Sequence, residues 1–184
     1  MISAGFPSYI RVGRLLGCLK EPLPIEHQML LMLNDLVVAI VVLVEKHSEG
    51  ENRVITPQLL LSAFALEIEL KCLLKICEID FPKRAGHNLK TLFFLLPDPN
   101  RERIIEIHRK QSETYGRSAA EADAYFHDTL EIAQEDFVTI RYVYEKRGGH
   151  ETRNLGPLVL AIYSYIFEVR PEWKDHQVDL GLTN

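Results

Sequence analysis

Apolar residues recur every three or four positions along most of this 184-residue chain, and no stretch alternates apolar and polar residues as a half-buried strand does. Such spacing places the apolar side chains along one side of a helix. The pattern therefore predicts an all-α fold, an antiparallel bundle of about five to six helices. The expected helices cover residues 25–47, 56–79, 87–96, 101–112, 118–147 and 157–170.

Local signals mark the ends of the longer helices. Ser118 and Glu121 have the spacing of a capping box, which begins a helix, and Gly148 is the first of two glycines that end it. Pro157 follows a glycine at the start of the last helix, where proline is favoured. The connections are short, and no proline-rich or serine-rich linker divides the chain. We therefore expect one helical domain over residues 25–173, preceded by an N-terminal arm, residues 1–24, and followed by a C-terminal tail, residues 174–184.

Composition narrows the possible functions. The formal net charge is −5, so the chain as a whole does not attract nucleic acid or an anionic membrane, and any RNA binding must come from a local site. Cys18, Cys72 and Cys77 form no CxxC motif, and the N-terminus lacks the pattern of a secretory signal, which favours a cytoplasmic protein. The apolar run over residues 36–44 is shorter than the about 20 residues that span a bilayer, so we expect a core or interface helix and no membrane contact.

Two charges interrupt the apolar side of the helix expected over residues 56–79. At about 100° per residue, Glu67 and Lys71 lie on one stripe with Phe64. They are four residues apart, with the acid nearer the N-terminus, which is the favourable orientation for an ion pair. Glu69 lies on the opposite side together with Ser62, where the same periodicity predicts a solvated face.

A second segment, residues 137–146, repeats this feature. Arg141 lies on the apolar stripe and Glu145 borders it, again four residues apart. The two helices are therefore expected to meet, so that Glu67, Lys71, Arg141 and Glu145 form one charged cluster. Two interpretations stay open: a salt-bridge network that determines packing, or a site for a polar ligand.

Three segments in order, FALEIELKCLL, GHNLKTLFFLL and FVTIRYVYEK, resemble the HEPN family (higher eukaryotes and prokaryotes nucleotide-binding), and within it a bacterial branch. Together they cover most of residues 57–146. The resemblance implies an antiparallel helical bundle that commonly dimerises. Some members are RNA-cleaving toxins, often partnered with nucleotidyltransferase-like antitoxins, whereas others bind nucleotides or scaffold assemblies. His87 matches a family position, where it either supports the start of the next helix or hydrogen-bonds a ligand beside the cluster.

The RNA-cleaving members of that family carry an arginine followed by a histidine after four to six residues. The arginine stabilises charge on the phosphorus centre and the histidine moves a proton. Arg141 has no histidine at this spacing. Arg103 and His108 have it, but they lie outside the matching segments, and we read the nuclease motif as absent, with this pair as the weak alternative. No ExxH, HExxH or P-loop motif is present, so neither a metal nor a cofactor is expected.

Three functions remain possible from the sequence. The first is a non-catalytic HEPN-like module that forms a homodimer and binds a nucleotide, RNA or a partner protein, including a nucleotidyltransferase-like one. The second is a metal-independent endoribonuclease that uses the off-pattern arginine and histidine. The third is a structural subunit without a ligand. For the dimer contact, the candidates are the apolar run over residues 36–44 and the C-terminal helix over residues 157–170.

Overall fold

The fold is entirely helical in the part of the chain that the computed structural model describes, residues 23–81, 86–134, 136–141 and 153–178. This confirms the all-α fold class. The elements, in order, are α1 (Ile25–Ser48), η2 (Asn52–Val54), α2 (Ile55–Ile76), α3 (Leu89–Leu95), α4 (Asp98–Glu113), α5 (Ala119–Ile132), α6 (Asp136–Arg141), α7 (Gly156–Val169) and η5 (Pro171–His176), where η denotes a 3-10 helix.

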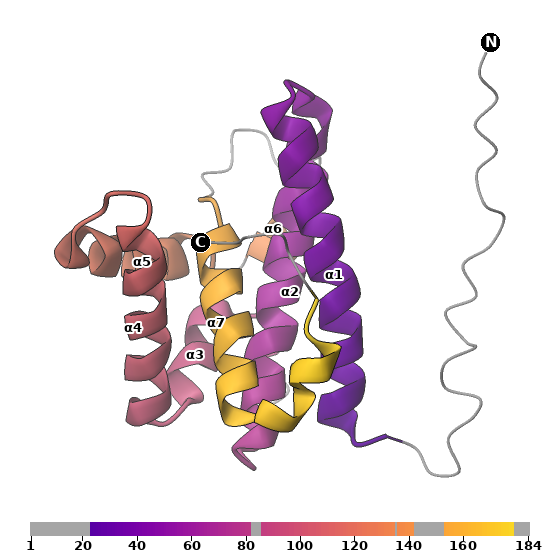
Figure 1. Cartoon of the computed structure of the whole chain (residues 1–184), viewed down its shortest axis with the longest axis vertical. Coiled ribbons are helices and arrows are strands. Elements are labelled where there is room, and N and C mark those ends of the chain that lie inside the picture. Colours follow the sequence, from indigo (N-terminus) through magenta and orange to yellow (C-terminus); the bar gives the residue numbers. More distant parts are fainter. Residues whose placement is uncertain (1–22, 82–85, 135, 142–152, 179–184) are drawn as a thin grey trace, which may run out of the picture.

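Helix α2 is the central element of the bundle. It runs antiparallel to α1, from which it is separated by a short turn, and it also packs against α3, α6 and α7 (Figure 1). Because neighbours surround it, α2 is buried around its circumference along much of its length. Its buried residues are Ser62, Ala63, Ala65, Leu66, Glu67, Ile68, Glu69, Leu70, Cys72, Leu73 and Leu74.

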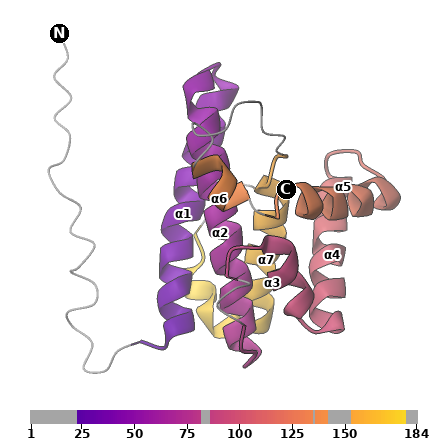
Figure 2. The same ribbon diagram turned by 180° about the vertical axis from the view of Figure 1, so that it is seen from behind.

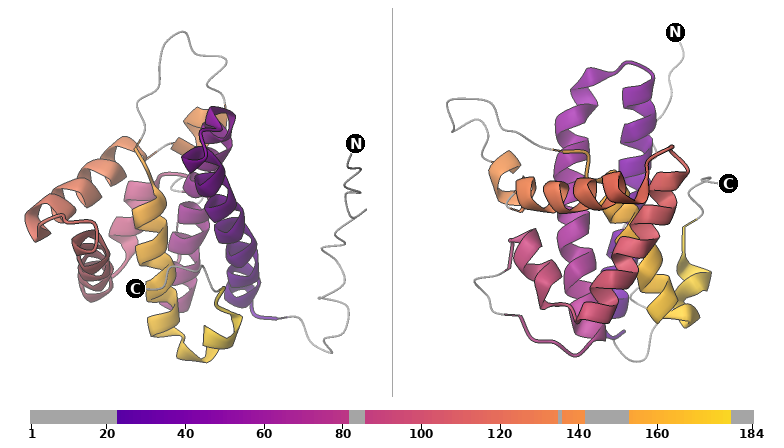
Figure 3. Two further views of the ribbon diagram at one scale, coloured as in Figure 1. Left: turned by 45° about the horizontal axis from the view of Figure 1, so that its top comes forward. Right: turned by 90° about the vertical axis from the view of Figure 1, so that its left-hand side faces the viewer.

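Helices α4 and α5 form a second layer on the other side of α7. Helix α4 packs along α7, and α5 runs across the direction of α2 (Figure 3). The predicted capping box is confirmed at the start of α5. The Ser118 hydroxyl accepts from the Glu121 backbone N–H at 3.4 Å, and the Glu121 carboxylate accepts from the Ser118 backbone N–H at 2.8 Å. This reciprocal cap satisfies two amide groups at the turn where the chain reverses from α4.

The single helix expected over residues 118–147 is wrong, because the chain leaves the helix after Ile132 and resumes as α6. The cause is a contact with the start of α3. The Leu89 backbone N–H, which has no partner within its own helix, donates to the Gln134 carbonyl at 2.9 Å. The Asn88 side chain also donates to the Gln134 side chain, at 3.3 Å. These bonds draw Gln134 out of helical geometry, and α6 then packs on α2 (Figure 2).

One side of α1 packs on α2, and the opposite side carries apolar residues without a neighbour among the described elements. The buried residues Leu30, Leu33, Val37 and Ile40 form the inner stripe. By length and composition alone α1 is long and apolar enough to cross a membrane, and 22% of its most apolar stretch is buried; mostly buried core helices and signal sequences near an N-terminus pass the same test. The apolar stretch is longer than the run over residues 36–44, because it extends to the N-terminal side of Asn34.

Candidate functional site

A buried carboxylate, Glu67 on α2, lies at the centre of the predicted charged cluster. Its side chain is only 4% exposed, and the Lys71 ammonium donates to it at 2.5 Å. The His87 ring nitrogen Nδ1 lies 3.1 Å from Oε1 and 3.0 Å from Oε2 of the same carboxylate. The structure therefore brings together Glu67, Lys71 and His87, three of the residues proposed from the sequence. We call them the Glu67 cluster.

The start of α3 determines where His87 lies. Asn88 is the N-cap of α3, and its side-chain oxygen accepts from the Thr91 backbone N–H at 2.8 Å. His87 precedes this cap directly, so the capped turn places its ring over α2. Both roles considered for His87 are thus compatible with its position: it ties the start of α3 to α2, and 59% of its side chain is exposed.

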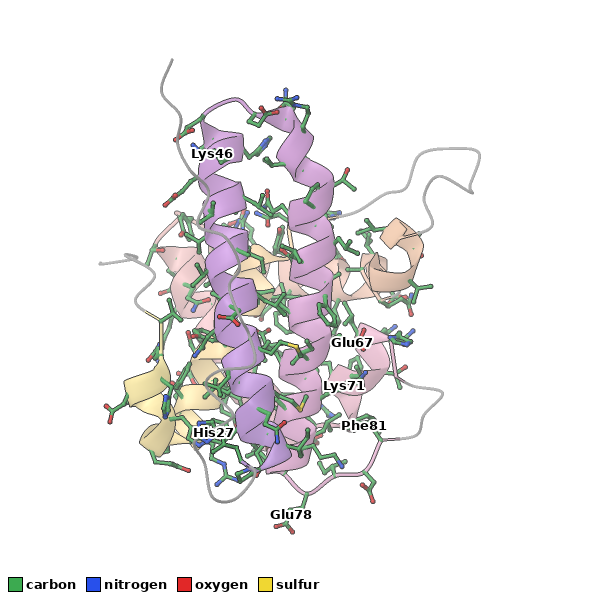
Figure 4. The ribbon with its side chains drawn as sticks, turned by 90° about the vertical axis from the view of Figure 1, so that its right-hand side faces the viewer. His27, Lys46, Glu67, Lys71, Glu78 and Phe81 are labelled. Carbon is green, nitrogen blue, oxygen red and sulfur yellow. The ribbon has the colours of Figure 1, made fainter. Side chains whose placement is uncertain are left out.

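A reversal of the chain after α2 brings an aromatic ring to the same surface. Glu78 has a φ of 56°, a left-handed conformation more common for glycine, and it ends the helix in a tight turn. The chain then returns alongside α2, where Phe81 lies 5.9 Å from the Lys71 ammonium and 5.6 Å from that of Lys75. Figure 4 shows Phe81 on the same side of α2 as Glu67 and Lys71. At these distances the ring face attracts both ammonium groups.

The Glu67 cluster is a compensated set of charges and not an isolated reactive group. Glu67 is satisfied by two nitrogen partners, and the Lys71 side chain is 19% exposed, so its charge reaches the edge of solvent. Such a set can hold a polar or anionic ligand through Lys71 and His87. Among the described residues, no group of three or more His, Cys, Asp or Glu side chains is placed to hold a metal ion.

The other half of the predicted cluster cannot be placed at the level of side chains. Arg141 is the last residue of α6, and α6 packs against α2. The Arg141 side chain and the whole of Glu145 lie outside the described residues. The meeting of the two helices is therefore observed for their backbones, and the contact between Arg141, Glu145 and the Glu67 cluster stays a prediction.

The alternative catalytic pair, Arg103 and His108, is not brought together on α4. Both terminal groups of Arg103 are engaged, with Nη2 2.7 Å from Glu168 and Nη1 2.6 Å from Glu106. His108 lies on a different side of the helix, fully buried, with its ring stacked on Tyr125 at a centroid distance of 6.1 Å. Burial, followed by the charge of Arg117, lowers the pKa of His108 to about 4.

Sequence reasoning missed a buried carboxyl group at Glu69. The expected solvated side of α2 is wrong, because both Glu69 and Ser62 are buried. Neither carboxylate oxygen of Glu69 has a hydrogen-bond partner among the described residues, and burial raises the pKa of this carboxyl well above its usual value. Burial, then the charges of Glu26 and Glu69, also raise the pKa of the nearby Cys72 thiol to about 12, so this thiol is unreactive.

We expect Lys71→Met to lower the free energy of unfolding by about 1–3 kcal/mol. The expected loss is larger than for an exposed ion pair. It is smaller than the about 3–5 kcal/mol lost when a buried pair is broken, because His87 still partners Glu67 in the variant. Urea denaturation of the single variants and of Lys71→Met combined with Glu67→Leu measures the coupling.

Lys75→Met is the matched control, since Lys75 lies over the same Phe81 ring but its side chain is 40% exposed. An equal loss in both lysine variants would contradict a specific Glu67–Lys71 interaction. A small loss together with lost binding of a nucleotide or RNA would favour a ligand site over a packing network.

No family model, curated protein or solved structure matches this chain significantly.

Proposed function

We propose that this chain is a non-catalytic, HEPN-like helical module that works as a homodimer and binds a nucleotide, RNA or a partner protein. The dimer contact is the outward side of α1, and the ligand site is the Glu67 cluster. The observation that carries the proposal is the exposure of apolar residues along α1. We call Leu31, Met32, Asp35, Val38 and Val42 the outer face of α1.

The outer face of α1 is apolar over most of its length. Val38 is 43% exposed, Met32 and Val42 are exposed to a similar degree, and Leu31 is half-buried. Exposed apolar strips of a few hundred Å² on soluble proteins commonly mark contacts with other molecules. The alternative dimer surface is less available, because most of α7 is buried. Its buried residues are Leu158, Val159, Ala161, Ile162, Tyr163, Tyr165, Ile166 and Phe167.

A second copy fits the outer face of α1 better than other occupants. Helix α1 carries Glu26 in its first turn and Lys46 and His47 in its last, so two copies in antiparallel orientation bring opposite charges together at both ends. With 24 residues the helix is about 36 Å long, enough for a contact at the small end of specific interfaces. A lipid surface is a poorer fit, because Lys46 is the only lysine or arginine within α1 that could meet an anionic headgroup.

The geometry of the remaining charges supports a module without catalysis. Arg103 is held by two carboxylates and His108 is buried as a neutral imidazole, so the pair offers no shared surface to a phosphodiester. The Glu67 cluster, by contrast, reaches the surface through His87 and Lys71. These two side chains supply donors for a phosphate group, whereas the carboxylate is satisfied and buried.

Val38→Glu should shift the protein from dimer to monomer. Each partner would bring a second carboxylate into the contact beside Asp35 without a counter-charge, which costs several kcal/mol and raises the dissociation constant at least about 100-fold. Sedimentation velocity across a range of micromolar concentrations measures the change.

Val44→Glu is the matched control for this experiment. Val44 lies on the same helix and is 42% exposed, nearly as much as Val38, but it projects from the opposite side. It should leave the dimer intact. A wild-type protein that is monomeric at these concentrations, or equal effects of both variants, would overturn the proposed interface.

A further inference from the structure

The last described segment, residues 171–178, closes against the N-terminal half of α1. It consists of η5 and the two residues that follow it, and we call it the C-terminal clasp. Figure 1 shows it in yellow between α7 and the lower part of α1. The sequence predicts that residues 174–178 belong to the tail beyond the domain. In the structure His176 contacts Asn34 on α1, and Val178 contacts Tyr163 on α7.

Two groups of contacts hold the clasp. The first is a chain of hydrogen bonds: the Asn34 amide donates to the His176 carbonyl at 2.6 Å, and the Tyr163 hydroxyl donates to the Asn34 side-chain oxygen at 2.6 Å. The Val178 backbone N–H in turn donates to the Tyr163 hydroxyl at 3.3 Å. None of the groups in these bonds gains or loses a proton between pH 5 and pH 8, so the hydrogen bonds themselves do not depend on pH in this range.

The second group of contacts consists of aromatic rings at the start of α1. The His27 ring lies 5.4 Å from the buried Trp173 ring and 5.0 Å, edge to face, from the His176 ring. The Arg170 guanidinium lies 5.5 Å from the Trp173 ring. His27 therefore contacts both the indole and the second imidazole, and His27, His176 and Arg170 all carry a positive charge when both histidines are protonated.

We propose that the C-terminal clasp is an acid-sensitive latch: protonation of His27 and His176 drives it away from α1 and uncovers the apolar side of α1 beneath Trp173. The contact is stable when both rings are neutral, since they then pack as aromatic groups. Two imidazolium ions at 5.0 Å repel each other, and a charged His27 must also give up part of its hydration.

The electrostatic surroundings of His27 favour the neutral ring while the clasp is closed. Burial, then the proximity of His176, lower the pKa of His27, and Glu26 on α1 opposes them with a smaller effect. The open clasp would return this pKa towards its ordinary value. Closure is therefore fully favoured above about pH 6.5 and is lost as the pH falls below it. On the side of the clasp, Glu172 lies 3.6 Å from Arg170, while Lys174 and Asp175 are exposed to solvent.

This latch does not depend on the proposed dimer. All contacts of the clasp lie within one chain, and Leu31 and Val38 of the outer face follow His27 and Asn34 by one helical turn each, so the two surfaces adjoin along α1. A protein that is monomeric at every pH could still open its clasp. Oligomeric state and clasp opening are thus separate measurements on the same full-length chain.

The single tryptophan makes the opening measurable, because Trp173 is the only one in the sequence. Acrylamide quenching of its fluorescence should rise at least about two-fold between pH 7.5 and pH 5, since a nearly buried indole becomes exposed. Far-UV circular dichroism at the same pH values should stay constant. His27→Gln should abolish most of the rise, and His176→Gln, at an exposed position, should reduce it.

His47→Gln is the control, because His47 is exposed near the other end of α1 and should leave the transition unchanged. Constant quenching down to the pH at which the helices unfold would overturn the latch. The latch would also be overturned if both His27→Gln and His176→Gln kept a quenching transition of the same size and midpoint as the wild type, because some other group would then be responsible.

Discussion

Glu69→Met should raise the free energy of unfolding at pH 7 by about 1–3 kcal/mol. The wild-type carboxyl is fully buried in α2, and neither of its oxygens has a partner among the described residues. Methionine has a similar length and shape, fills the same space and needs no hydrogen bond, so the substitution removes the penalty of a buried unsatisfied group. Chemical denaturation at pH 7 measures the gain.

The pH dependence separates this explanation from a simple gain in packing. Burial raises the pKa of Glu69, so the folded protein keeps the proton that the unfolded chain releases above about pH 4.5. The contribution of Glu69 to wild-type stability should therefore fall as the pH rises from 4.5 toward the pKa of the folded state, opposite in sign to the contribution of His108 below pH 6.5. In Glu69→Met and Glu69→Gln this fall should be absent, although the glutamine variant still buries an unpaired amide. A decline that persists in both variants would show that another group is responsible.

Acid should destabilise the fold through His108, by about 3 kcal/mol between pH 6.5 and pH 4. The folded state holds this imidazole neutral, with a pKa of about 4, because it is buried between α4 and α5. The unfolded chain binds a proton below about pH 6.5, so stability is complete above that value and is lost as the pH falls. Urea denaturation at half-unit pH steps in the Glu69→Met background, where the opposing contribution of Glu69 is removed, measures this slope.

His108→Gln should flatten the slope between pH 6.5 and pH 4, even if it lowers stability at neutral pH. His127→Gln is the matched control, because His127 lies on α5 beside the same Phe126 ring but is exposed. It should keep the wild-type slope. If both variants kept that slope, His108 would not be the titrating group. The contribution of the clasp is recognised separately, since it changes Trp173 quenching without loss of helix.

The helical architecture was predictable because periodicity and end signals are local properties of the chain. The bounds of α1 and α7 agree with the pattern to within one residue, and the capping box begins α5 at the expected place. The break after α5 was not predictable from local signals. It results from a hydrogen bond between Leu89 and Gln134, which are distant in the sequence.

Only the part of the candidate site that lies on a single helix could be predicted from helical periodicity. Glu67 and Lys71 are one helical turn apart, and the resemblance to the HEPN family added His87. Glu69 was misplaced because a helical wheel assumes one solvated side, whereas α2 has neighbours on all sides. The contacts of His27 with His176 join opposite ends of the domain, and no periodic pattern carries that information.

The contact between His27 and His176 also determines when the domain can be completed during synthesis. The two residues are separated by about 150 positions, which a ribosome translates in about 7–30 s. Throughout that interval the side of α1 that Trp173 later covers has no partner in the nascent chain. Helix α1 must therefore remain soluble, or be held by a chaperone, until Trp173 and His176 have emerged. Synthesis that stops before residue 171 leaves this surface permanently uncovered, and such fragments become substrates for aggregation or proteolysis.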